Sequence, residues 1–180
     1  LRAETNIVKP LQEHYERMNQ ELLKLWFDHY GEYKESQKGY LVRLIKETQK
    51  KIAIIVGDGV RYEVADSVAS RLSSDIKTDK NFMYAGLPSE TEHNMSALYT
   101  TDGRIIADKK EREKILSAET GKDIVYMQLE DVNGTTEGDI LVLTYKDIDD
   151  AGEKMQQSML RLVDEFEDIL VEKIQLLLHL

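Results

Sequence analysis

The feature that most constrains the fold is a continuous apolar run at residues 52–56, Ile-Ala-Ile-Ile-Val, followed by the turn Gly57-Asp58-Gly59. A short run without polar alternation is typical of a strand buried on both faces of a parallel sheet. Apolar residues then recur at helical spacing as far as Leu72. The strand, tight turn and helix together predict the opening unit of an α/β fold.

The remainder of the sequence continues this alternation. Apolar spacing predicts a helix after Thr91, a short helix over 111–116 and a long helix through Ile174. Short apolar runs predict strands at 123–127 and 139–143. Because strands that alternate with helices build parallel sheets, these elements extend the predicted α/β fold.

The first 50 residues predict helix instead. Apolar residues recur there at steps of three and four, at Ile7, Leu11, Tyr15, Met18, Leu22, Leu25 and Trp26. Gly31 interrupts the pattern, and a second apolar set predicts a shorter helix from Tyr40. We therefore expect a helical hairpin over 1–50 ahead of an α/β domain over 51–180. The hairpin is interpreted as packing on that domain or on sequence outside this chain, with a dedicated partner-binding role as the alternative.

The composition excludes several classes of function. The formal net charge of −10 argues against a broad surface for gripping nucleic-acid phosphates. No apolar run approaches the roughly 20 residues that cross a bilayer. The absence of cysteine excludes disulfides and thiolate metal sites, and favours a cytoplasmic protein. An acidic chain can still process phosphate esters when bound metal ions supply the positive charge.

Asp58 is the first candidate for chemistry. It follows an apolar strand, and open α/β sheets bind ligands outside the carboxyl ends of their strands. The alternative is an ordinary turn residue or a helix cap. A dinucleotide fingerprint would need a glycine near Tyr62, and a haloacid-dehalogenase-like site would need an Asp in place of Val60, so both of these sites are excluded.

Two further groups follow. Ser89 or Thr91 would lie at a helix start, where free N–H groups and the helix dipole favour negative charge. A hydroxyl there could attack phosphorus. The alternative is that the hydroxyl only caps the helix. Asp149 and Glu153 are four residues apart where a strand leads into a helix, so both carboxylates could meet one cation. The alternative is that they are favourable acids in a first helical turn.

Three segments, in this order, resemble the PglZ family of the alkaline-phosphatase superfamily. Asp58-Gly59-Val60-Arg61-Tyr62-Glu63 resembles its Asp-x-x-Arg-Tyr-Glu signature after an apolar strand. Pro88-Ser89-Glu90-Thr91 is similar to its Pro-Ser-x-Thr segment before a Met-x-x-Leu helix. Tyr145 to Lys154 is similar to its Tyr-x-x-Ile-Asp-x-x-Gly-Asp/Glu-Lys stretch. The resemblance covers about residues 50 to 178.

This resemblance implies a three-layer α/β/α sheet like that of alkaline phosphatase, incomplete in this chain, with two divalent metal ions, Zn or Mn. Asp58 and Thr91 would bind one ion, and Thr91 would be the nucleophile. Asp149 and Glu153 would bind the other ion, although many relatives have His at the latter position. Arg61 could steady a phosphate oxygen, with a salt bridge to a nearby acid such as Glu63 as the alternative.

The implied activity is hydrolysis of a phosphate ester, nucleotide or nucleic acid, by a phosphatase, phosphodiesterase or nuclease. The family is associated with bacterial phage defence and related domains with signalling, so partner proteins are expected. Two alternatives remain: a non-catalytic PglZ-like interaction module, and a plain α/β fold in which the three segments are caps and turns.

One departure from the family concerns the later metal ligands, an Asp-His pair and a further His. The Asp-His pair in this chain, Asp28-His29, lies ahead of all three segments, and none follows Glu153. We therefore expect a domain truncated on its C-terminal side, which by itself is inactive and binds metal weakly or not at all. The apolar residues near its end, including Ile174 and Leu178, are expected to promote self-association.

Overall fold

The computed structural model describes residues 2–180 apart from 73, 75, 88 and 146–158. The chain divides into two compact units, Leu1–Glu35 and Ser36–Leu180. The prediction placed the boundary between residues 50 and 51.

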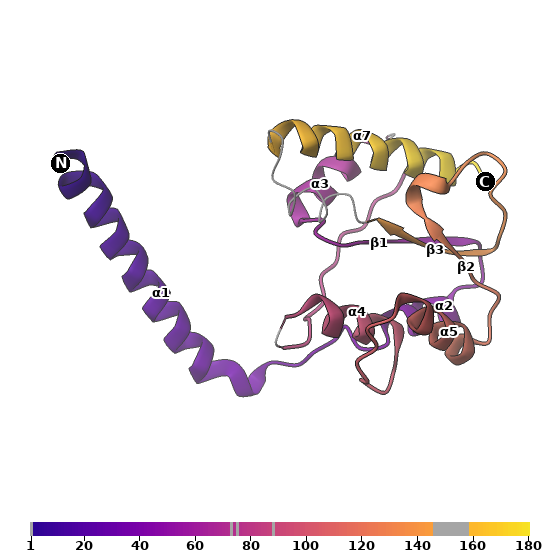
Figure 1. The fold of residues 1–180 in the computed structure, drawn as a ribbon, viewed down its shortest axis with the longest axis horizontal. Coiled ribbons are helices and arrows are strands. Elements are labelled where there is room, and N and C mark those ends of the chain that lie inside the picture. Colours follow the sequence, from indigo (N-terminus) through magenta and orange to yellow (C-terminus); the bar gives the residue numbers. More distant parts are fainter. Residues whose placement is uncertain (1, 73, 75, 88, 146–158) are drawn as a thin grey trace. The chain divides into compact units, whose positions relative to one another are not determined.

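The first unit is one continuous helix (Figure 1). A π-helical turn η1 (Glu4–Val8) leads into α1 (Lys9–His29), which ends in the 3-10 turn η2 (Tyr30–Glu32). The ring of Trp26 lies 5.7 Å from those of Tyr30 and Tyr33, so three aromatic side chains gather where the helix ends. The predicted hairpin is therefore wrong, because no second helix folds back along α1 within this unit.

The second predicted helix, α2 (Tyr40–Glu47), belongs to the other unit. Its side chains Leu41, Val42 and Ile45 are buried in a core shared with the sheet. The N–H of Gly39 also donates to the carbonyl of Ala97, at 2.7 Å. Burial against distant elements, which local spacing does not reveal, is the reason that this helix belongs to the second unit.

The sheet has three parallel strands in the order β1-β3-β2, namely β1 (Ile52–Gly57), β2 (Val125–Gln128) and β3 (Ile140–Tyr145). All three predicted strands are thus present. Every residue of β3 is buried, which suits its central place and its apolar sequence. Registers Ile52↔Ile140 and Val125↔Leu141 align the strands.

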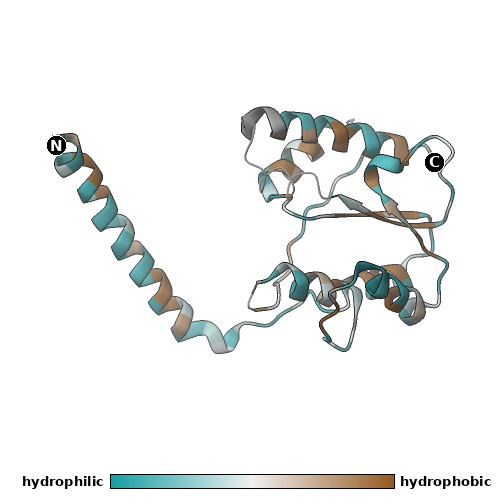
Figure 2. Ribbon diagram, viewed as in Figure 1, coloured by the Kyte–Doolittle hydropathy of each residue, from teal (hydrophilic) through white to brown (hydrophobic). Residues whose placement is uncertain are grey.

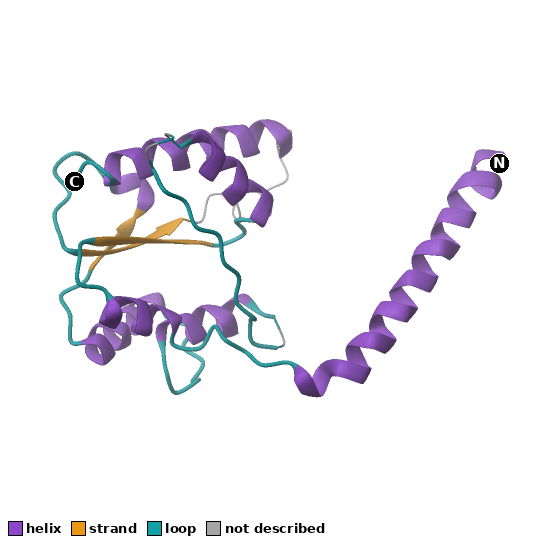
Figure 3. Cartoon of the chain, turned by 180° about the vertical axis from the view of Figure 1, so that it is seen from behind, coloured by secondary structure: helices purple, strands orange, loops and turns teal. Residues whose placement is uncertain are grey.

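Helices cover both faces of the sheet, as Figures 1 and 3 show. One face carries α2, α4 (Thr91–Tyr99) and α5 (Lys109–Thr120), and the other carries α3 (Tyr62–Arg71) and α7 (Met159–Leu177). Successive side chains of β3 point to opposite faces, so that Val142 enters the first core and Leu143 the second. Brown apolar stripes on α7 lie toward the sheet in Figure 2. The predicted α/β class is confirmed.

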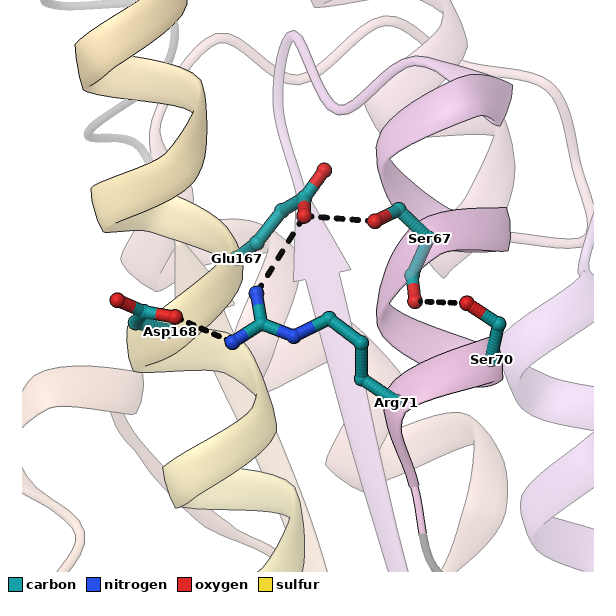
Figure 4. A network of polar contacts seen from close by, with 5 residues as sticks. All are labelled: Ser67, Ser70, Arg71, Glu167 and Asp168. Atoms are coloured by element: carbon teal, nitrogen blue, oxygen red, sulfur yellow. Dashed lines mark hydrogen bonds and ion pairs between the residues drawn. The ribbon is translucent and has the colours of Figure 1, made fainter.

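A polar network joins α3 to α7 above the second core (Figure 4). The carboxylate of Glu167 accepts hydrogen bonds from the hydroxyl of Ser67 at 2.6 Å and from Arg71 at 3.4 Å. Arg71 also pairs with Asp168, and this contact chiefly raises the pKa of its guanidinium. These side chains hold α3, the helix that follows Asp58, against the long helix.

Among the helices that the structure describes, none combines the length and the apolar character that crossing a membrane would require.

Candidate active site

The carboxyl ends of the parallel strands meet at one edge of the sheet. There the backbone N–H of Asp58 donates to the carbonyl of Tyr145, the last residue of β3, at 3.0 Å. Asp58 thus continues the β1–β3 ladder by one residue. The segment that contains Asp149 and Glu153 begins directly after Tyr145. Two of the predicted ligand segments therefore leave neighbouring strands at the same edge.

The turn after β1 sets the position of Asp58. A Cβ on Gly57 would lie 2.5 Å from a methyl group of Val60, so only glycine lets that side chain fold against the strand end. Gly59 has a φ of 72°, in the left-handed region that favours glycine. Asp58 is half-buried, and within the described chain its carboxylate accepts no hydrogen bond and forms no ion pair. The residue at the N-cap of α3 is Arg61, so Asp58 is not the cap.

Thr91 is the first residue of α4, and its side chain is exposed. The N-cap is Glu90, whose side chain makes no capping hydrogen bond. The hydroxyl of Ser89 accepts from the side-chain amide of Asn94 at 3.5 Å, and Ser89 likewise does not cap the helix. Thr91 is thus not the helix cap, and its hydroxyl lies at the positive end of the helix dipole.

The contacts of α5 fix the direction of α4. Lys109 at the start of α5 donates to the hydroxyl of Thr144, near the carboxyl end of β3, at 2.9 Å. At the far end of α5, Glu119 accepts a hydrogen bond from the Thr101 hydroxyl, just after α4, at 2.7 Å. Helix α5 therefore runs from the carboxyl edge of the sheet toward the opposite edge, and α4 ends beside the end of α5. Helix α4 thus also begins toward the carboxyl edge. Thr91 therefore lies toward the edge at which Asp58 lies.

Arg61 lies between Asp58 and the first turn of α3, with an exposed side chain. In the described part of the chain it forms no ion pair, with Glu63 or with any other acid. The guanidinium is consequently available to an anion at this edge.

Asp149 and Glu153 lie in 146–158, outside the described residues. Over the rest of the chain, no group of three or more His, Cys, Asp or Glu side chains is placed to hold a metal ion. Asp58 and Thr91 are therefore the described oxygen donors of the predicted set.

Sequence reasoning missed a polar group at the same edge. The Thr144 hydroxyl, almost fully buried, donates to the side-chain carbonyl of Gln128 at 2.8 Å while it accepts from Lys109. Lys109 also lies 3.6 Å from Glu113, one turn along α5. The signal in the sequence was the cap: Asp108 accepts from the N–H of Glu111, which marks the helix start. Its partner on β3 is 35 residues away, beyond any local pattern.

Two tyrosines on the α5 side of the sheet have raised pKa values. Burial raises the pKa of Tyr99 to about 12, against the opposing effect of Arg112, whose guanidinium carbon lies 6.0 Å from the ring centre. Burial also raises the pKa of Tyr126, against the effect of its hydrogen bond with Ser117. Both phenols are protonated at neutral pH, so they serve as packing and hydrogen-bonding groups.

Comparison with known proteins gives one result. Residues 39–174 match the family described as the BREX system PglZ alkaline phosphatase-like domain. No curated protein matches the chain, and no solved structure does. The match includes the helix α2 as well as the three segments that predicted the family, and it confirms the resemblance. The chain belongs to the PglZ alkaline phosphatase-like domain family of the BREX phage-defence system.

Proposed function

We propose that this chain supplies part of the active site of a metal-dependent phosphoesterase, with Thr91 as the nucleophile. The observation that carries the proposal is the hydrogen bond between Asp58 and Tyr145, because it ends β1 and β3 side by side. A carboxylate then stands at one strand end, and the segment that contains Asp149 and Glu153 follows the other strand in the sequence. This is the arrangement that an α/β sheet needs to gather ligands at its carboxyl edge.

The donor chemistry fits divalent cations. Asp58 and Thr91 would hold one ion, and Asp149 and Glu153 the second. These side chains are all oxygen donors, which suit Mg²⁺ or Mn²⁺, and Zn²⁺ also accepts carboxylates. The half-buried Asp58 carboxylate has no described partner that a metal would have to displace. When bound, such ions supply the positive charge that neutralises phosphate oxygens.

The hydroxyl of Thr91 performs the substitution at phosphorus. Its oxygen forms a bond to phosphorus while the bond from phosphorus to the departing alcohol breaks, and its proton passes to solvent. Water then attacks the phosphothreonine, releases phosphate or a phosphate monoester and restores the hydroxyl. The N–H groups in the first turn of α4, which Glu90 does not cap, favour the negative charge that develops beside Thr91.

Arg61 assists by binding a non-reacting phosphate oxygen. Its side chain is exposed next to Asp58 and forms no ion pair within the described chain. A guanidinium can give two parallel hydrogen bonds to a phosphate, which orients the group as well as attracting it. The substrate class is a phosphate mono- or diester, including nucleotides or nucleic acid, processed in phage defence within the cytoplasm.

The test is a matched pair of threonine variants in the protein as it occurs in its cell. With Mn²⁺ or Zn²⁺ and a nitrophenyl phosphodiester, Thr91→Ala is expected to lower turnover by at least about a thousandfold, since no other group replaces a covalent nucleophile. The control is Thr78→Ala, which removes another exposed hydroxyl and should leave turnover unchanged. A Thr91→Ala protein with most of its metal-dependent activity would remove Thr91 from the mechanism.

Metal binding is tested separately by calorimetric titration. Asp58→Asn is expected to weaken Mn²⁺ binding by about tenfold or more, because a neutral amide replaces a charged ligand. Asp123→Asn, an exposed acid before β2 and thus near the opposite edge of the sheet, should leave affinity unchanged. Equal affinities for Asp58→Asn and the unaltered protein would exclude Asp58 as a ligand.

A second candidate function is a non-catalytic module that binds partner proteins of the defence system. The observation in its favour is that the described residues contain no group of three metal ligands. This alternative predicts no turnover and no tight metal binding in the unaltered protein. The turnover and the metal affinity of the unaltered protein, measured in the two experiments above, therefore distinguish the two functions.

A further inference from the structure

The helix α1 carries an apolar stripe of a particular period. Its members alternate steps of three and four residues along η1 and α1, at Val8, Leu11, Tyr15, Met18, Leu22 and Leu25. These six side chains are between 44% and 66% exposed. A strict alternation of three and four is the heptad repeat, in which every second step returns to the same line along a supercoiled helix. The stripe therefore has the form of a coiled-coil seam.

The residues beside the seam also fit a coiled coil. Four of the positions that flank the seam are polar, as is typical of coiled coils, namely Gln12, His14, Asn19 and Glu21, while Ile7 and Trp26 flank its two ends. The helix Lys9–His29 carries four acids against three Lys and Arg residues. Helices that lie on membranes have a strongly basic polar face, so the charge of α1 favours another helix over a lipid surface.

We propose that α1 pairs with α1 of a second copy of this chain as an antiparallel two-stranded coiled coil. In that arrangement Val8 packs against Leu25 of the second copy and Leu11 against Leu22. The central layer brings Tyr15 against Met18, a ring and a thioether, which form favourable contacts. Each seam residue thus meets a different residue of its partner.

A hydrogen bond between flanking side chains favours the antiparallel direction. It places His14 beside Glu21 of the second copy, and symmetry repeats the contact, so an imidazole N–H can donate to a carboxylate at two places. A parallel pair would instead set His14 beside Asn19 and Glu21 beside Trp26, which separates the imidazole from the carboxylate. It would also stack Tyr15 on its own copy.

The dimer is expected to be weak. The seam is only about 26 Å long at the helical rise of 1.5 Å per residue, and helices of this length are marginally stable alone. Association should therefore depend on concentration within the range that sedimentation equilibrium covers. The average mass of the 180-residue chain should rise from 20.8 kDa toward twice that value.

Adjacent leucines give a matched test. Leu22 lies on the seam and Leu23 does not, yet both are more than half exposed. Leu22→Glu is expected to weaken self-association at least about tenfold, because it forces a carboxylate into an apolar layer. Leu23→Glu adds the same charge outside the seam and should leave association unchanged. A chain that stays monomeric at every concentration, including one that binds anionic vesicles instead, would overturn the proposal, as would equal effects of both variants.

Orientation is tested by cross-linking, since the chain contains no cysteine. Leu11→Cys mixed with Leu22→Cys is expected to give a disulfide-linked dimer between the two variants. Each variant alone should remain largely uncross-linked, because its cysteines lie about three turns apart in the antiparallel pair. Efficient cross-linking of either variant by itself would show a parallel pair and refute the antiparallel arrangement.

Discussion

Tyr99 shows how burial changes one residue's chemistry. Only 2% of its surface is exposed, and burial holds the pKa of its phenol at about 12 against an ordinary value of 10.0. When folding raises the pKa of a phenol, its contribution to the free energy of unfolding is fully present at pH values below the pKa of the unfolded chain. That contribution is lost as pH rises through the folded value. The relevant window therefore runs from pH 10.0 to about 12.

Replacing Tyr99 by Phe should remove this dependence. The free energy of unfolding of the unaltered chain should fall by about 2–3 kcal/mol more across the window than that of Tyr99→Phe. Denaturant unfolding at a series of pH values measures the difference. Tyr62→Phe, at a tyrosine that is 71% exposed, serves as the control and should follow the unaltered chain. Parallel curves for Tyr99→Phe and the unaltered chain would contradict this account of Tyr99.

At the scale of elements, the polar contacts between α3 and α7 depend chiefly on Glu167. Its half-buried carboxylate accepts from both Ser67 and Arg71, whereas Asp168 is 70% exposed and contacts Arg71 alone. Glu167→Ala is expected to cost about 1–2 kcal/mol of unfolding free energy, because two donors lose their acceptor. Asp168→Ala should change it little. Thermal and denaturant unfolding of the two variants provide the comparison, and equal losses would contradict the larger contribution assigned to Glu167.

The strands were predictable because their apolar runs are local and continuous. The pattern at 52–56 and 139–143 needs no distant partner to be read. The hairpin was predicted wrongly, because the interruption at Gly31 was interpreted as a link between paired helices, whereas Gly31 lies within the 3-10 turn that follows α1. Likewise, the burial of Ile45 depends on a core that includes residues of α4 and α5, far along the chain.

The same distinction between local patterns and distant contacts applies to the candidate site. Asp58 was identified from its place after a strand, and Thr91 from its place before a helix. That both lie toward one edge follows from hydrogen bonds between distant segments, which the sequence does not encode locally. Lys109 was missed for the same reason, since only folding brings it to Thr144.

At the scale of the whole molecule, the two units give a prediction about where the chain can be cut. A chain that begins at Ser36 keeps every residue of the second unit and should unfold at the same temperature as the full chain. One that begins at Lys51 loses Leu41, Val42 and Ile45, whose burial contributes about 1.5–3 kcal/mol each. It is expected to unfold at a much lower temperature or to aggregate. Calorimetry of the two shortened chains measures the difference in unfolding temperature. Equal unfolding temperatures would place the boundary between the units at residue 50.

The edge position of β1 has a consequence for Asp58. Within the described chain β1 pairs only with β3, and the amides of Ile52 and Asp58 both point toward that neighbour. Since successive residues of a strand alternate, the amides of Ala53, Ile55 and Gly57 point the other way. In a hydrogen–deuterium exchange experiment, every second amide of this strand is therefore open to exchange, as far as the turn after Gly57. Asp58 is the last residue whose amide β3 protects, so an opening of the β1–β3 pairing from its carboxyl end begins at the residue proposed to bind metal.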